Sequence, residues 1–151
     1  MNAESWLLQN HTVRFGDSDA AGVMHFHRLF CWCHEAWEAS LENFGLTTAT
    51  IFPGCRNHPE PPEVALPIIH CQANFRRPIK TGDQLIIELN PSQIDLCSFQ
   101  IEFQLICNSE NAAQALIRHL AINSETRQRC ELPEGIGRWL EASNVGRIGS
   151  I

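Results

Sequence analysis

Two aspartates lie two residues apart in a glycine-flanked loop near the start of the chain, in residues 15–22 (FGDSDAAG). A helical pattern begins a few residues later. A carboxylate in this setting can act as base or nucleophile toward an ester or thioester, while the free N–H groups of a helix start polarise the carbonyl. The alternative is a solvent-exposed turn in which an aspartate caps the backbone. The loop therefore indicates either hydrolytic chemistry or a simple capped turn.

Composition narrows the class of protein. The chain has 151 residues, a net charge of −6, 19% charged and 44% apolar residues, which predicts one globular domain over residues 1–151. Without a basic patch we expect no nucleic-acid partner. Without a signal peptide or a long apolar run we expect no membrane insertion and a cytoplasmic location. Seven cysteines without a C-x-x-C motif predict reduced thiols in the core.

A long amphipathic helix is predicted directly after the aspartate loop. A strand over residues 7–15 leads into the loop, and the helix follows from about His27 to Phe44. Gly45 is expected to end the helix. The apolar residues on one helical face are three or four positions apart: Phe30, Cys33, Trp37, Leu41 and Phe44. The helix therefore has a broad buried face and begins where the carboxylates are.

The rest of the chain predicts a sheet. An irregular segment over residues 46–63 precedes four expected strands at 64–77, 84–90, 98–107 and 113–124, with turns at 80–83 and 109–111. Short links favour antiparallel neighbours among these strands. A short helix at about 133–142 and a loose tail from about 143 would complete the chain. One long helix covering one face of the sheet gives an α+β class. The uncovered face and edges predict a homo-oligomer, either a dimer or a dimer-of-dimers tetramer.

Two segments carry a family resemblance. Residues 15–24 (FGDSDAAGVM) and 75–83 (FRRPIKTGD) resemble the hotdog-fold acyl-CoA thioesterases of the 4-hydroxybenzoyl-CoA thioesterase type, over about residues 7–125. The resemblance implies an antiparallel β-sheet wrapped around a long central helix, an acyl-CoA substrate and no cofactor. Residues 33–38 (CHEAWE) look most like the 1,4-dihydroxy-2-naphthoyl-CoA hydrolases of phylloquinone and menaquinone synthesis.

The resemblance also implies roles for residues of the loop. Asp19 would be the catalytic carboxylate, either activating water or attacking the carbonyl to give a mixed anhydride. Phe26 and His27 would offer oxyanion N–H groups, and Gly22 would let the backbone approach closely. His25 either contacts substrate and water or is a packed polar residue. The chain departs from the family at two positions, since many relatives carry an aromatic at the position of His25 and a Tyr at that of Phe26. A backbone role for Phe26 survives this change, whereas a hydroxyl role would not.

For several other polar residues, the sequence allows either a functional role or a structural one. Asp17 is expected to cap the loop, and Glu35 on the helix is a fallback base. We expect no metal site, because His25, His27 and His34 lack the spacing of a zinc motif. Basic residues at turns are candidates for the coenzyme A phosphates, or simply solvated: Arg76, Arg77, Lys80, Arg127 and Arg129. Helix aromatics that could line the acyl slot, or only fill the core, are Phe30, Trp32 and Trp37.

The leading hypothesis is therefore hydrolysis of an aromatic acyl-CoA ester. A thioesterase for 4-hydroxybenzoyl-CoA or for an aliphatic acyl-CoA is the enzymatic alternative. A non-catalytic acyl-CoA-binding protein of the same fold is the alternative from another class. An intact Asp19 favours the enzymatic interpretations.

Overall fold

The computed structural model describes residues 4–54 and 60–148. Its main sheet has five antiparallel strands in the order β1-β4-β5-β6-β3, and a second sheet pairs β2 with β7. The strands are β1 (Leu8–Thr12), β2 (Val64–Ala65), β3 (Ile68–Phe75), β4 (Gln84–Gln93), β5 (Ser98–Cys107), β6 (Glu110–Leu120) and β7 (Ile122–Asn123). The helices are α1 (Glu4–Leu7), α2 (Arg28–Phe44) and α3 (Glu134–Ile148), with 3-10 turns η1 (Phe15–Asp17) and η2 (Thr48–Thr50).

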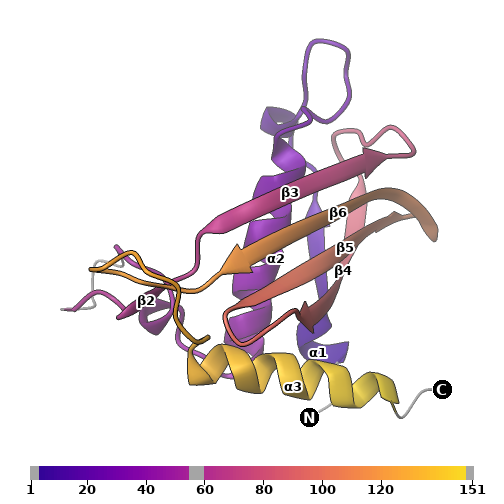
Figure 1. Ribbon diagram of the computed structural model, residues 1–151. Helices are drawn as coiled ribbons and strands as arrows, with labels where there is room; N and C mark the ends of the chain where they lie inside the picture. Colours follow the sequence, from indigo (N-terminus) through magenta and orange to yellow (C-terminus); the bar gives the residue numbers. More distant parts are fainter. Residues whose placement is uncertain (1–3, 55–59, 149–151) are drawn as a thin grey trace.

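The long helix α2 is confirmed. It packs along one face of the sheet, while α3 crosses one end of the strands (Figure 1). Gly45 caps α2 with φ of 111°, a left-handed conformation that glycine adopts without steric cost. Its buried face carries Leu29, Trp32, Cys33, Ala36, Trp37, Ser40 and Leu41. The predicted helical stripe is therefore the face that meets the sheet.

Buried residues alternate with less buried ones along the strands, and these buried residues form the other half of the core. In β5, Phe99, Ile101, Phe103 and Leu105 are buried while the residues between them face away from α2. The same alternation in β4 and β6 closes the layer between sheet and helix. The result is the expected α+β hotdog architecture, an antiparallel sheet around a long helix.

The position of β3 corrects the predicted strand order. β3 pairs with β6, not with β4, so it forms an edge of the sheet. β4 has β1 on one side and β5 on the other, which leaves it no free edge for β3. Seven of the eight residues of β3 are exposed, on both of its faces.

Several element boundaries also differ from the prediction. β1 is shorter than the expected strand, since Phe15 already begins a 3-10 turn, and Pro67 separates β2 from β3 within the strand expected over 64–77. The β5–β6 turn lies at Asn108 and Ser109, which both have positive φ, and not at 109–111. α3 continues to Ile148, so the loose tail expected from about residue 143 is wrong through 148.

The cysteines are less buried than predicted. All six that the structure describes are free thiols, but only Cys33 is buried, whereas Cys31 and Cys71 are exposed. Cys55 lies outside the described residues. The expectation of core thiols is therefore wrong for most of them. None of the helices in the described part of the chain combines the length and hydropathy that a membrane span requires.

Candidate active site

The aspartate loop is a closed turn held against the segment that precedes β4. Ser18 and Met24 form an isolated antiparallel bridge, and the N–H of Asp19 donates to the carbonyl of Val23 at 2.8 Å. Gly22 closes the turn with φ of 79°. The N–H of Met24 donates to the carbonyl of Ile79 at 2.7 Å, which ties the loop to residues 75–83. The two segments that carry the resemblance are thus neighbours in space.

Asp17 is a buried organiser of this loop. Its Oδ2 accepts from the N–H of Arg14 at 2.9 Å, which gives it the predicted capping contact. Its carboxylate also lies 3.6 Å from Nε of Arg28 and 3.9 Å from Nε2 of His11. The carbonyl of Asp17 accepts from the N–H of His25 at 2.7 Å. Asp17 therefore connects β1, the loop and the first turn of α2.

Asp19 is in the opposite environment. It is exposed at the tip of the turn, and its Oδ1 accepts from the N–H of Ala21 at 2.7 Å. No hydrogen bond to Oδ2 and no ion pair of Asp19 occurs within the described residues. One oxygen fixes the carboxylate while the other is available to a water molecule or a carbonyl carbon.

The start of α2 leaves N–H groups free beside this loop. The N-cap residue His27 makes no side-chain capping bond, and the N–H of Arg28 donates to the carbonyl of His25 at 2.9 Å. No backbone carbonyl in the described chain accepts from the N–H of Phe26 or of His27. These are the groups that the sequence predicted for carbonyl polarisation, and the helix dipole adds to their positive potential.

His25 and His27 are brought together. Their Nδ1 atoms are 2.6 Å apart, so one ring must donate and the other accept. Their ring centroids are 4.2 Å apart, and His25 also packs against Phe26 at 5.2 Å. The two histidines hold the residues on either side of Phe26 in a compact turn. Over the described residues, no group of three or more His, Cys, Asp or Glu side chains is arranged for a metal ion.

A mainly apolar hollow of about 400 Å³ lies between the loop and the segment after β3. Its lining residues are Val23, Met24, Phe26, Phe75, Arg76, Arg77, Pro78 and Ile79. Phe26 and Phe75 are 67% and 50% exposed, so this concave surface offers aromatic rings to a ligand. Sequence reasoning named Phe26 only for its N–H, and missed Phe75 and Ile79 as lining residues. The match at residues 75–83 was the signal that could have identified them.

Only some of the predicted phosphate-binding residues line this hollow. Arg76 and Arg77 line it, with Arg76 Nη2 donating to Gln114 Oε1 at 3.0 Å and Arg77 Nε lying 3.0 Å from Glu110 Oε2. Lys80 is not among the lining residues. Its turn nevertheless lies beside the aspartate loop, because Ser18 Oγ and Thr81 Oγ1 are 2.6 Å apart. Arg127 and Arg129 are exposed beyond β7 and do not line the hollow.

Glu35 and the helix aromatics lie elsewhere. Glu35 is on the exposed face of α2 and does not line the hollow. Trp32 and Trp37 are fully buried in the core, 2% and 1% exposed, and Phe30 is partly buried against it. These aromatics therefore belong to the packed layer, and the exposed aromatic ring that α2 and its preceding loop offer to the hollow is that of Phe26.

Comparison with known proteins identifies the family of this chain. The sequence profile of the thioesterase-like superfamily matches residues 13–140. The 1,4-dihydroxy-2-naphthoyl-CoA hydrolase of Prochlorococcus marinus strain MIT 9303 is 67% identical over 151 residues, which is 100% of both chains. The hydrolase of the same name from Synechococcus sp. strain WH7803 is 51% identical over 99% of this chain and 98% of its own.

Solved structures agree as well. A crystal structure from Prochlorococcus marinus strain MIT 9313 superposes with a TM-score of 0.93 at 66% identity, covering 95% of this chain and 99% of the other. The 1,4-dihydroxy-2-naphthoyl-CoA thioesterase of Synechocystis has the same fold, with a TM-score of 0.77 at 23% identity over 89% of this chain and 94% of the other. The chain therefore belongs to the thioesterase-like superfamily and, within it, to the family of the 1,4-dihydroxy-2-naphthoyl-CoA hydrolases.

Proposed function

We propose that this protein hydrolyses 1,4-dihydroxy-2-naphthoyl-CoA to 1,4-dihydroxy-2-naphthoate and coenzyme A, a step of phylloquinone or menaquinone synthesis. The observation that carries the proposal is that the loop holding an exposed, half-anchored Asp19 leads directly to free N–H groups at the start of α2. Similarity over the whole length to hydrolases of that name supports the choice of substrate. The catalytic unit is a single domain that spans the chain.

Hydrolysis of the thioester needs only the Asp19 carboxylate, water and the N–H groups of Phe26 and His27. With Asp19 as base, its carboxylate takes a proton from water as the water oxygen bonds to the thioester carbon. The N–H groups of Phe26 and His27 stabilise the negative oxygen of the tetrahedral intermediate, and one such donor contributes about 2.7–4 kcal/mol. Collapse breaks the C–S bond and releases the coenzyme A thiolate. With Asp19 as nucleophile, its carboxylate oxygen bonds to the thioester carbon, and breaking of the C–S bond releases the same thiolate and leaves a mixed anhydride. Water then cleaves this anhydride and restores the Asp19 carboxylate.

The hollow supplies a place for the rest of the substrate. Its rings and aliphatic side chains suit a flat aromatic acyl group, and Phe26 belongs both to the hollow and to the oxyanion turn. Arg76 and Arg77 stand at the hollow with exposed guanidinium groups, where the phosphates of coenzyme A would find opposite charge. His25, beside Phe26, would orient the acyl group or the water.

The functional form would be a homo-oligomer assembled through the β3 edge. No other strand of the described residues pairs with the outer edge of β3, and its Ile68, Ile69 and Phe75 are each at least 44% exposed. Phe75 also lines the hollow, so a second copy at this edge would cover the open side of the site. The free thiols favour a reducing, cytoplasmic location.

The test is thiol release by the purified protein with a panel of coenzyme A esters: dihydroxynaphthoyl, 4-hydroxybenzoyl, short aliphatic and long aliphatic. We expect kcat/KM to be highest for the dihydroxynaphthoyl ester. A preference for aliphatic esters would keep the role of Asp19 but overturn the proposed substrate. Ester binding without thiol release from any member of the panel would favour a non-catalytic binding protein.

A further inference from the structure

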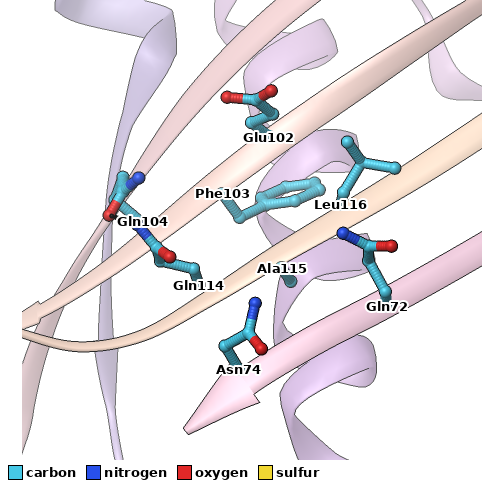
Figure 2. A pocket seen from close by; sticks show the side chains of 8 residues that line it. All are labelled: Gln72, Asn74, Glu102, Phe103, Gln104, Gln114, Ala115 and Leu116. Carbon is cyan, nitrogen blue, oxygen red and sulfur yellow. Dashed lines mark hydrogen bonds between the residues drawn. The ribbon is translucent and has the colours of Figure 1, made fainter. Parts of the chain in front are cut away.

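Two of the free thiols, Cys97 and Cys130, lie on segments that meet at one end of the main sheet. β5 and β6 run side by side (Figure 2), and their register ends with Ser98 opposite Leu120. One residue further along, the N–H of Ala121 donates to the carbonyl of Cys97 at 2.7 Å. Cys97 therefore lies beside Ala121, just beyond the paired strands.

Cys130 reaches the same residue from a segment much later in the chain. Its N–H donates to the carbonyl of Ala121 at 3.0 Å, so both cysteines bond through their backbones to one residue. The segments that carry them are also in direct contact, because the N–H of Leu132 donates to the carbonyl of Leu96 at 2.9 Å. These three hydrogen bonds hold the backbones of Cys97 and Cys130 next to each other.

Electrostatic interactions connect the side chains of the two segments as well. Burial raises the pKa of the Cys130 thiol, and charge repulsion from Cys97 and Glu63 raises it further. The pKa of Asp95 is lowered chiefly because its carboxylate accepts from the N–H of Cys97, and Arg129 adds to this lowering from the other segment. The contact between the segments therefore extends from their backbones to their side chains.

Both thiols are open to a small reagent. Cys97 and Cys130 are each half-exposed, whereas Cys33 is buried in the core. Extended segments joined by hydrogen bonds hold facing Cα atoms about 4.5–5.5 Å apart. This separation falls within the range of about 4.4–6.8 Å that a disulfide spans. The arrangement of the two backbones is therefore compatible with a disulfide between these cysteines.

We propose that Cys97 and Cys130 are a redox-responsive pair that forms a disulfide when hydrogen peroxide is present. The Sγ of one cysteine attacks the peroxide as a thiolate, which breaks the O–O bond and gives a sulfenic acid and hydroxide. The hydroxide takes up a proton and becomes water. The Sγ of the other cysteine then attacks the sulfenic sulfur, and its thiol proton leaves with the displaced hydroxyl as a second water. The two sulfurs lose two electrons in total, and the peroxide gains them.

The disulfide would connect the start of β5 to the segment that leads into α3. It would close a loop over residues 97–130, which contains β5, β6 and β7. A cross-link over a loop of this length restricts the unfolded chain, so we expect the melting temperature to rise by about 10 °C. In a reducing compartment such a pair is reduced by default and becomes oxidised only transiently.

The test is peptide mapping after treatment of the full chain with hydrogen peroxide. The remaining thiols are blocked, and the chain is cleaved after Lys and Arg without reduction. We expect peptide 81–118, which carries Cys97, to be joined to peptide 130–138, which carries Cys130. Dithiothreitol should separate the two peptides and reverse the rise in melting temperature.

The matched control is Cys107→Ser, because peptide 81–118 also contains Cys107. The ten residues of β5 place Cys107 about 33 Å from the start of the strand, so it should not reach Cys130. Cys107→Ser should keep the joined peptides and the rise in melting temperature. Cys97→Ser and Cys130→Ser should each lose both, and circular dichroism should show that all three variants are folded.

The proposal is overturned if the oxidised, unaltered protein contains no such joined peptides, or if Cys107→Ser removes them. It is also overturned if electrophoresis without reductant shows that the link joins two chains. The readout is a covalent bond far from any turnover measurement, so the proposal neither rests on the proposed hydrolysis nor fails with it.

Discussion

The aspartate loop and the layer between α2 and the sheet use similar residue types for opposite purposes. Phe26 is 67% exposed at the hollow, whereas Phe99 is fully buried against Trp37 and Trp139. In the loop, His25 and His27 bond to each other near solvent. In the layer, His119 is 1% exposed and stacks on Phe99 with ring centroids 5.0 Å apart. The side chains proposed to contact a ligand are exposed, and the side chains that stabilise the fold are buried in the layer between α2 and the sheet.

The largest effect expected is on turnover by Asp19→Asn. The asparagine oxygen can still accept from the N–H of Ala21, so the loop keeps its shape, but the base or nucleophile is lost. We expect kcat/KM for the dihydroxynaphthoyl ester to fall by about 10²–10⁴-fold, with the melting temperature unchanged. Thiol release and thermal unfolding measure the two quantities. Turnover like that of the unaltered protein would remove Asp19 from the mechanism.

Asp17→Asn is the matched control for that variant. It removes the charge facing Arg28 and His11 from a buried position, so it should lower the free energy of unfolding by about 1–2 kcal/mol. Its rate should fall less than that of Asp19→Asn. A greater loss of rate at Asp17 would exchange the roles of the two carboxylates.

The packed layer should make stability depend on pH through His119. Burial lowers the pKa of His119 from 6.5 to about 4, and burial also lowers the pKa of His34 beside it. Below pH 6.5 the unfolded chain binds a proton that the folded chain does not. The free energy of unfolding should therefore decrease by about 3 kcal/mol as the pH falls from 6.5 to 4, and this contribution should be constant below that.

Urea unfolding at a series of pH values checks this dependence. The variant His119→Phe keeps a ring that can stack on Phe99 but cannot titrate, so its stability should vary less with pH over the same range. The assignment to His119 would be contradicted by equal slopes in the two proteins. Turnover is not the readout here, because His119 does not line the hollow.

The smallest effect expected is on substrate affinity through Arg77. Its side chain is 58% exposed and already pairs with Glu110, so a phosphate contact there would be weakened by salt. We expect Arg77→Gln to raise KM about 3–10-fold with kcat nearly unchanged. Added salt should raise KM more for the unaltered protein than for the variant. Arg127→Gln, which changes an exposed arginine outside the lining of the hollow, serves as control. An equal rise in KM for this variant would show that Arg77 has no specific role.

Local patterns were sufficient for much of the fold. The stripe from Phe30 to Phe44 and the glycine that follows it predicted α2 to within one residue, because helix periodicity and the C-cap are properties of neighbouring residues. The alternation over 98–107 predicted β5 with its bounds. The neighbour of β3 could not be predicted in this way, because the alternation along a strand does not say which edge is free.

The same division holds at the site. The sequence by itself determined that an aspartate loop precedes a long amphipathic helix, because each is a pattern of residues that are close together in the chain. Only the tertiary structure decided that Asp17 is buried among Arg14, Arg28 and His11 while Asp19 keeps an oxygen free. It also decided that Phe75 and Ile79 lie beside Phe26 to form the hollow. Solvent exposure and contacts between distant segments depend on how the strands pair and close around α2, and no local pattern specifies that pairing.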